Sequence, residues 1–219
     1  GYAVVKDYSH GKKELILPVI KPYLITFTQK QAGFETEVKE NILKVKLNEN
    51  TYKIAEKLKK DLFIVSKDGR EVMADTAVKL MQKLHQIYSG TVLFEDGTHK
   101  IIDTSKAEFI KEHFKGKRLG IFYKFKAEFE VLKSVFGSDL TNDLETFDNG
   151  CKHIALQFQS GKEGISLKNA DVLVAYNIDF SATTYFQFKD RMTTFDRKEN
   201  DLYWIFSDNG IESSIYEKV

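Results

Sequence analysis

Four short, continuous apolar runs mark the second half of the chain. They are Leu119–Tyr123, Ile154–Phe158, Val172–Tyr176 and Leu202–Phe206. Runs without strict alternation of apolar and polar residues are typical of parallel strands that are covered on both faces. Between the runs, apolar residues recur at helical spacing, notably over residues 125–136 and 185–195. Strands that alternate with helices predict a three-layer α/β fold with a mainly parallel sheet.

The first 90 residues show a different pattern of small, mixed elements. An extended segment around residues 42–47 precedes a helical stretch over 51–60, and Asp68-Gly69 is typical of a hairpin turn. Apolar residues at helical spacing follow over 77–88, and Gly90 is a plausible helix stop. A second Asp-Gly turn lies at Asp96-Gly97. We interpret residues 1–90 as a helical and hairpin connector and residues 91–219 as the α/β domain.

Composition limits the classes of function. The chain has 42% hydrophobic and 30% charged residues and lacks the roughly 18 to 20 consecutive apolar residues of a membrane helix, so we expect a cytoplasmic protein without membrane contact. Cys151 is the only cysteine, and the five histidines are dispersed, which argues against an internal disulfide and a zinc site. With 33 basic against 32 acidic residues, any contact with nucleic acid must be local.

Two segments that follow predicted strands carry candidate chemistry. Ligands of open parallel sheets bind beyond the carboxyl ends of the strands. The loop 159–167 contains a hydroxyl group, two glycines and charges of both signs, and glycines let backbone N–H groups approach phosphates. The helix predicted to begin near Ser181 has Gln187 and Arg191 on a polar stripe that could hold a phosphate. Ordinary turn geometry and an ordinary solvated helix face explain the same residues, so at this point both alternatives stay open.

The order of the motifs resembles that of motifs IV, V and VI of superfamily-two helicases. The succession is a basic start of a strand at Lys117-Arg118, a Ser-Gly-x-x-Gly-Ile-x-Leu loop, an Asn-Ala-Asp-Val-Leu-Val strand and a Gln187-x-x-x-Arg191 helix. It is most similar to the Swi/Snf-like branch, in which an Asp-x-x-Trp-Asn-Pro-like turn precedes the Gln-x-x-x-Arg helix. The resemblance is strong from about residue 104 and loose before it, where Lys21-Pro22-Tyr23 resembles the segment that joins the two lobes.

The resemblance implies a role for each matching residue. It assigns arginine-finger catalysis to Arg191 and Arg197, contacts with ATP to Glu163, Gly164 and Gln187, and contacts with the nucleic-acid backbone to Lys124, Ser160, Gly161 and Lys162. An arginine that motif VI usually carries is replaced here by Thr194, and we expect Arg197, one turn further on, to substitute for it. Two arginines usual in the family are likewise replaced by Thr26 and Phe27.

The sequence lacks a Gly-x-x-x-x-Gly-Lys-Ser/Thr phosphate loop. The resemblance therefore implies that ATP and Mg²⁺ are held mainly by an N-terminal lobe of the same protein and that these 219 residues alone do not hydrolyse ATP. The leading hypothesis is the C-terminal half of an ATP-dependent helicase or translocase that acts on nucleic acid, with double-stranded DNA as the expected substrate.

Two other hypotheses stay open beside this one. A non-catalytic module that binds nucleic acid or protein would explain Thr194. A free-standing α/β enzyme would need a nucleophile–base pair, which we do not find. The small size of the domain suggests a phage or bacterial protein, in host cytoplasm if viral.

Overall fold

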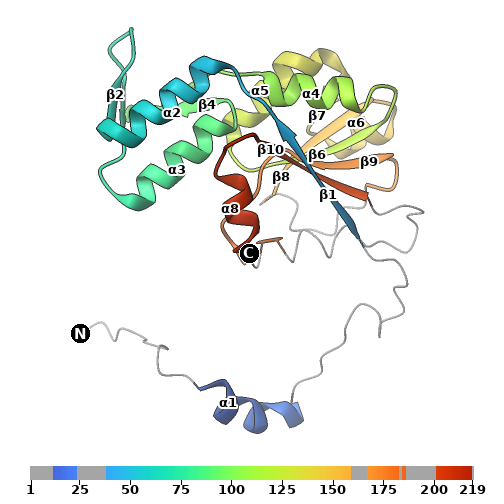
Figure 1. Ribbon diagram of the computed structural model, residues 1–219. Helices are drawn as coiled ribbons and strands as arrows, with labels where there is room; N and C mark the ends of the chain where they lie inside the picture. The colour runs from blue at the N-terminus through green and yellow to red at the C-terminus, as the bar shows by residue number, and fades with distance from the viewer. Residues whose placement is uncertain (1–11, 24–37, 159–166, 183, 186–200, 219) are drawn as a thin grey trace, which may run out of the picture. The chain divides into compact units, whose positions relative to one another are not determined.

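The structure is a computed structural model that describes residues 12–23, 38–158, 167–182, 184–185 and 201–218. A six-stranded sheet carries the fold (Figure 1). Its strands are β1 (Lys39–Val45), β6 (Leu119–Tyr123), β7 (Leu140–Thr141), β8 (His153–Gln157), β9 (Val172–Ala175) and β10 (Asp201–Ser207). They lie in the order β1-β10-β9-β6-β8-β7, and all neighbouring strands are parallel. The predicted α/β fold with a mainly parallel sheet is confirmed.

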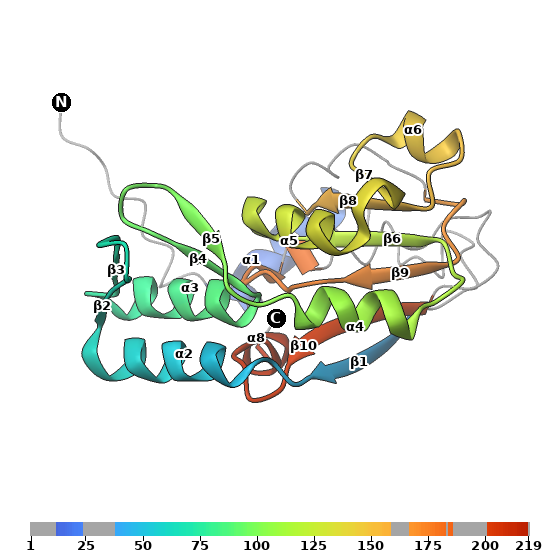
Figure 2. The ribbon, with the colours of Figure 1, turned by 90° about the horizontal axis from the view of Figure 1, so that it is seen from above.

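Helices cover both faces of this sheet. On one face, α4 (Ser105–His113) and α5 (Lys126–Phe136) pack against β6 and β9 (Figure 2). On the other face, α6 (Leu144–Asp148) and α8 (Glu212–Tyr216) pack against a core that includes the fully buried Trp204. Since both faces are covered, the central strands are apolar at nearly every position, which is why they appear in the sequence as continuous runs.

Strand β1 comes from the segment that the sequence assigned to the connector, yet it pairs with β10 over its whole length. It is an edge strand, and from Asn41 to Val45 exposed positions alternate with partly or fully buried ones. An edge strand with Lys39, Glu40 and Lys44 has none of the continuous apolar character of a central strand. The division of the chain at residue 90 stays a prediction.

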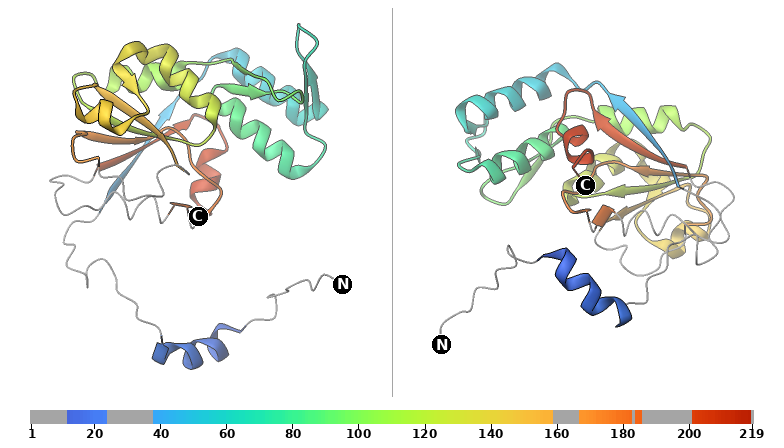
Figure 3. Two further views of the ribbon diagram at one scale, coloured as in Figure 1. Left: turned by 180° about the vertical axis from the view of Figure 1, so that it is seen from behind. Right: turned by 60° about the horizontal axis from the view of Figure 1, so that its bottom comes forward.

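A small unit, which we call the helical insert (residues 49–101), separates β1 from α4. It consists of α2 (Glu49–Asp61), the hairpin of β2 (Phe63–Val65) and β3 (Glu71–Met73), α3 (Ala77–Tyr88), and the hairpin of β4 (Thr91–Leu93) and β5 (His99–Ile101). Helices α2 and α3 lie side by side (Figures 1 and 3) and bury their own core, which includes Leu58 and Ile87. Both predicted hairpins and both predicted helices of this segment are present.

Gly90 joins α3 to the second hairpin at a position that admits no side chain. Its φ is +90°, and an added Cβ would lie 2.2 Å from the carbonyl oxygen of Asp103. The Gly90 carbonyl accepts a hydrogen bond from the N–H of Ile102 at 2.9 Å. Only glycine combines this backbone conformation with so close an approach, which fixes the end of α3 against the start of α4.

The helix α1 (Lys13–Ile20) and the 3₁₀ turn η1 (Lys21–Tyr23) belong to a separate compact unit, Gly1–Glu35, and the remaining elements belong to the unit Thr36–Val219. Among the described residues, no helix is long and apolar enough to span a membrane.

Candidate functional site at the carboxyl edge of the sheet

The carboxyl ends of the parallel strands bring two predicted motifs to one edge of the sheet. Lys124 directly follows β6, and Asp179 belongs to the turn that follows β9. The Nζ atom of Lys124 lies 2.7 Å from Oδ1 of Asp179, and it sits over the ring of Phe180 at 4.6 Å from the ring centroid. The two charged side chains are about a fifth exposed, at 18% and 22%.

Lys124 is the one predicted nucleic-acid contact that lies among the described residues. The structure pairs it with an acidic partner rather than leaving it free in solvent. A phosphate that approaches this edge must therefore compete with the Asp179 carboxylate for the ammonium group. The contact between Lys124 and nucleic acid stays a prediction.

Asn177 forms the centre of a buried hydrogen-bond network beside this pair. Its Oδ1 accepts from the N–H of Ile178 at 2.8 Å and from Nε2 of His85, which comes from α3 of the helical insert. Its Nδ2 donates to Oε1 of Glu128. The other Glu128 oxygen, Oε2, accepts from the N–H groups of Lys124 at 2.7 Å and Phe125 at 3.0 Å. One network thus fixes the turns after β6 and β9 and joins them to the insert.

Burial controls the charge of the two titratable groups in this network. Burial lowers the pKa of His85 well below its usual value, and the nearby Lys124 ammonium lowers it further, so the imidazole is neutral at pH 7. Nε2 then carries the proton that is donated to Asn177, and no described residue is a partner of Nδ1. Burial likewise raises the pKa of Glu128, against the effect of its hydrogen bonds. The rings of Phe125 and Phe180 enclose the His85 imidazole edge-on.

A second buried network lies at the ends of β9 and β10. Nζ of Lys106, on α4, lies 3.3 Å from Oε1 of Glu212, on α8, and both side chains are almost fully buried. The other Glu212 oxygen, Oε2, accepts from Oγ of Ser207 at 2.7 Å. The Lys106 ammonium also sits over the ring of Tyr176, whose hydroxyl donates to the carbonyl of Ser89 in the insert at 2.8 Å. This ion pair links the helices on opposite faces of the sheet.

No role was assigned from the sequence to His85, Glu128, Asn177 or Glu212, although Asn177 belongs to the turn that precedes the Gln187-x-x-x-Arg191 helix. Their partners are far apart along the chain, 92 residues for His85 and Asn177 and 49 for Glu128 and Asn177. The position of Asn177 in the sequence was one available signal. A polar residue that directly follows a buried strand lies at the carboxyl edge of the sheet, where it can hold a turn by hydrogen bonds.

The other predicted site residues lie outside the described residues. These are Ser160, Gly161, Lys162, Glu163, Gly164, Gln187, Arg191 and Arg197. The loop that contains the first five follows β8, where Nε2 of Gln157 donates to the carbonyl of Lys124 at 2.8 Å. The chain therefore leaves β8 beside Lys124, at the edge that carries the ion pair with Asp179.

The helix predicted to carry Gln187 and Arg191 begins after the turn that follows β9. Ser181 Oγ accepts from the N–H of Thr184 at 3.2 Å, which is the geometry of a helix N-cap. The ring of Tyr185 stacks on Trp204, and its hydroxyl donates to Glu40 of β1. The predicted apolar stripe of this helix thus contacts the core at Tyr185.

Replacing Asn177 by alanine is expected to lower the free energy of unfolding by about 1–3 kcal/mol, because it removes the partner of buried groups on His85, Ile178 and Glu128. Urea denaturation of both proteins measures the change. Asn169→Ala is the matched control, because Asn169 is exposed and its side-chain amide donates to Asp148, which is exposed too. Equal stability of the two variants would show that the Asn177 network contributes nothing.

The fold is similar to that of a solved ATPase lobe. The crystal structure of the C-terminal part of the Fun30 ATPase domain matches with a TM-score of 0.57 and 15% identity, over 83% of this chain and 88% of that chain. The crystal structure of the Pyrococcus furiosus Hef helicase domain matches with a TM-score of 0.41 and 14% identity, over 53% of this chain and 28% of that chain. No family model and no curated protein matches the sequence. The chain therefore has an α/β, RecA-like fold, similar to that of the C-terminal part of the Fun30 ATPase domain.

Proposed function

We propose that this chain is the C-terminal lobe of a nucleic-acid-dependent ATPase of the superfamily-two helicase class. The observation that carries the proposal is the likeness in fold to the C-terminal part of an ATPase domain, which extends over 88% of that part. The order of the sequence motifs supports it, because the strands that precede motifs IV, V and VI end at one edge of the sheet. In this proposal residues 1–90 connect the lobe to its N-terminal partner lobe.

The residues of the carboxyl edge have separate tasks in this proposal. Arg191 and Arg197 reach the γ-phosphate of ATP, while Glu163, Gly164 and Gln187 contact the nucleotide. Ser160, Gly161, Lys162 and Lys124 contact the phosphate backbone of the nucleic acid, which needs no sequence recognition. The sequence has no Gly-x-x-x-x-Gly-Lys-Ser/Thr phosphate loop, so the proposal assigns Mg²⁺ to the N-terminal lobe.

The geometry around Lys124 supports a coupling between nucleic acid and nucleotide. A phosphate that draws the Lys124 ammonium away from Asp179 changes the charge balance of the turn after β9. The helix that begins at that turn leads in sequence to Gln187 and Arg191. In this proposal, binding of the nucleic-acid backbone at Lys124 changes the position of the residues that contact ATP.

ATP hydrolysis by the complete gene product, measured with and without double-stranded DNA, tests the proposal. We expect hydrolysis that DNA stimulates, and no hydrolysis by residues 1–219 alone. Lys124→Ala should weaken the stimulation, whereas Lys126→Ala, a matched control at an exposed position of α5, should not. A complete gene product that does not hydrolyse ATP at all would contradict the proposal.

The second candidate function is a non-catalytic module that kept the fold of a motor lobe. Thr194 favours it, because motif VI usually carries an arginine there. Binding of DNA by the complete gene product without ATP hydrolysis would support this module and exclude the motor.

A further inference from the structure

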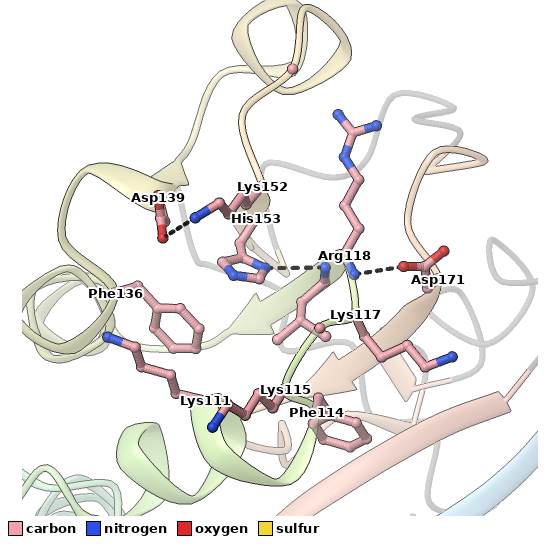
Figure 4. A pocket seen from close by; sticks show the side chains of 13 residues that line it. Lys111, Phe114, Lys115, Lys117, Arg118, Phe136, Asp139, Lys152, His153 and Asp171 are labelled. Carbon is pink, nitrogen blue, oxygen red and sulfur yellow. Dashed lines mark hydrogen bonds and ion pairs between the residues drawn. The ribbon is translucent and has the colours of Figure 1, made fainter.

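A pocket of about 580 Å³ lies at the edge of the sheet opposite to the proposed motor site (Figure 4). Its walls come from the loop after α4, the end of α5 and the amino-terminal ends of β6 and β8. We call it the amino-edge pocket. Its volume lies in the range of about 300–1,000 Å³ that is usual for sites of small molecules.

Positive charge gathers around the amino-edge pocket although the chain as a whole has a net charge of only +1. Five cationic residues line it, namely Lys111, Lys115, Lys117, Arg118 and Lys152. The two acidic residues of the lining, Asp139 and Asp171, are already engaged: Nζ of Lys152 lies 2.8 Å from Asp139, and Asp171 accepts from the N–H of Arg118 at 2.7 Å. In the part of the chain that the structure describes, no ion pair engages Lys115 or Lys117.

The interior of the pocket is apolar and carries one neutral hydrogen-bond donor. Phe114, Leu119 and Phe136 are buried side chains of the lining. His153 lies edge-on to the ring of Phe136, at 5.1 Å between ring centroids, and its Nδ1 accepts from the N–H of Leu119 at 3.3 Å. Burial lowers the pKa of His153, so the ring is neutral at pH 7 and Nε2 carries the proton. No described residue accepts a hydrogen bond from this Nε2–H.

Helix stability explains only part of this arrangement. Nζ of Lys111 donates to the carbonyl of Val135 in α5 at 2.7 Å, and Lys115, just past α4, stabilises the exposed carbonyl groups at the C-terminus of that helix. Helix stability does not account for Lys117, which lies past the end of the helix, or for the His153 donor that comes from β8. Nor does helix stability require an apolar interior behind the cations.

We propose that the amino-edge pocket binds a small phosphate monoester with an aromatic or apolar body. In this proposal the phosphate binds at the loop after α4, where the exposed Lys115 and Lys117 supply positive charge, and the body packs on Phe114 and Phe136. Figure 4 shows the side chains of Lys115 and Lys117 running in different directions from the loop after α4, and the His153 ring on another side of the pocket, where its Nε2–H can donate to a phosphate oxygen. The proposal does not depend on the proposed motor function, because the pocket and Lys124 lie at opposite edges of the sheet.

Calorimetric titration of the protein with phenyl phosphate, phenol and inorganic phosphate tests the proposal. We expect phenyl phosphate to bind more tightly than inorganic phosphate and phenol not to bind. The amide NMR signals of Gly116 and His153 should shift on titration with phenyl phosphate. The double variant Lys115→Glu/Lys117→Glu should weaken binding about tenfold or more, because charge-assisted hydrogen bonds are lost.

The double variant Lys57→Glu/Lys60→Glu is the matched control, since it makes the same change of charge at exposed positions of α2. Equal weakening in both double variants would overturn the proposal, because the effect would then be one of net charge. Absence of phenyl phosphate binding would overturn it too. If a single-stranded oligonucleotide binds through Lys115 and Lys117 while phenyl phosphate does not, the pocket is a nucleic-acid contact and the small-ligand proposal is wrong.

Discussion

Replacing Arg191 by alanine in the complete gene product is expected to slow DNA-stimulated ATP hydrolysis by about 10³-fold to 10⁵-fold, which is the contribution of an arginine finger. The affinity for ATP should change far less, because the guanidinium acts on charge that develops on the transferred phosphoryl group. Steady-state turnover with and without DNA, together with nucleotide binding at equilibrium, separates the two quantities.

The expectation for Arg191 depends on motif order and on where its helix begins. The described start of that helix, after Ser181, lies at the carboxyl edge, where a neighbouring lobe of an α/β protein presents its ligand. Arg70→Ala is the matched control, because Arg70 belongs to the turn of a hairpin in the insert and pairs with Asp68. Unchanged turnover in Arg191→Ala would remove the arginine-finger role.

Arg197→Ala answers a separate part of the same question. A loss of turnover comparable with that of Arg191→Ala would mean that Arg197 replaces the arginine that motif VI usually has at Thr194. Normal turnover would mean that the proposed ATPase works with a single arginine in motif VI.

Replacing Lys106 by methionine is expected to lower the free energy of unfolding by about 3–5 kcal/mol, because it leaves a buried carboxylate without its cation. Lys106 and Glu212 have side-chain exposures of 1% and 0%, so solvent cannot replace the missing partner. The substitution also removes the cation from the face of the Tyr176 ring. Urea denaturation at constant pH measures the change.

The double variant Lys106→Met/Glu212→Gln separates the cost of a lone buried charge from the value of the pair. It should recover much of the lost stability, since buried ion pairs replaced by neutral groups of similar volume are often nearly neutral in effect. Lys79→Met is the surface control, because the pair of Lys79 with Asp75 is about half exposed and should contribute little. A Lys106→Met variant as stable as Lys79→Met would contradict the importance of the buried pair.

The hydrophobic pattern was sufficient to predict the central strands and most helices, because continuous apolar runs and helical spacing are both local features of the sequence. Strands β6, β8, β9 and β10 are apolar at most positions, so each could be located to within about a residue or two. Strand β1 alternates, as an edge strand does, and its membership of the sheet depends on pairing with β10, more than 150 residues away. The pattern of residues within β1 does not show which strand it pairs with.

Residues of the candidate site could be predicted where they belong to one contiguous motif. They could not be predicted where residues far apart in the sequence come into contact only in the folded structure. Lys124 could be placed at the carboxyl edge because it directly follows a strand. Its partner Asp179 and the network of His85, Glu128 and Asn177 depend on which loops the sheet order brings together. The polarity of these residues predicts solvent exposure, and only their mutual hydrogen bonds make burial acceptable.

The bonds that tie the helical insert to the sheet have a mechanical consequence. Apolar surfaces can slide over one another at little cost, whereas hydrogen bonds of His85 to Asn177 and of Tyr176 to Ser89 hold one orientation only. The helical insert is therefore held in one orientation relative to the turn after β9, which carries Asn177.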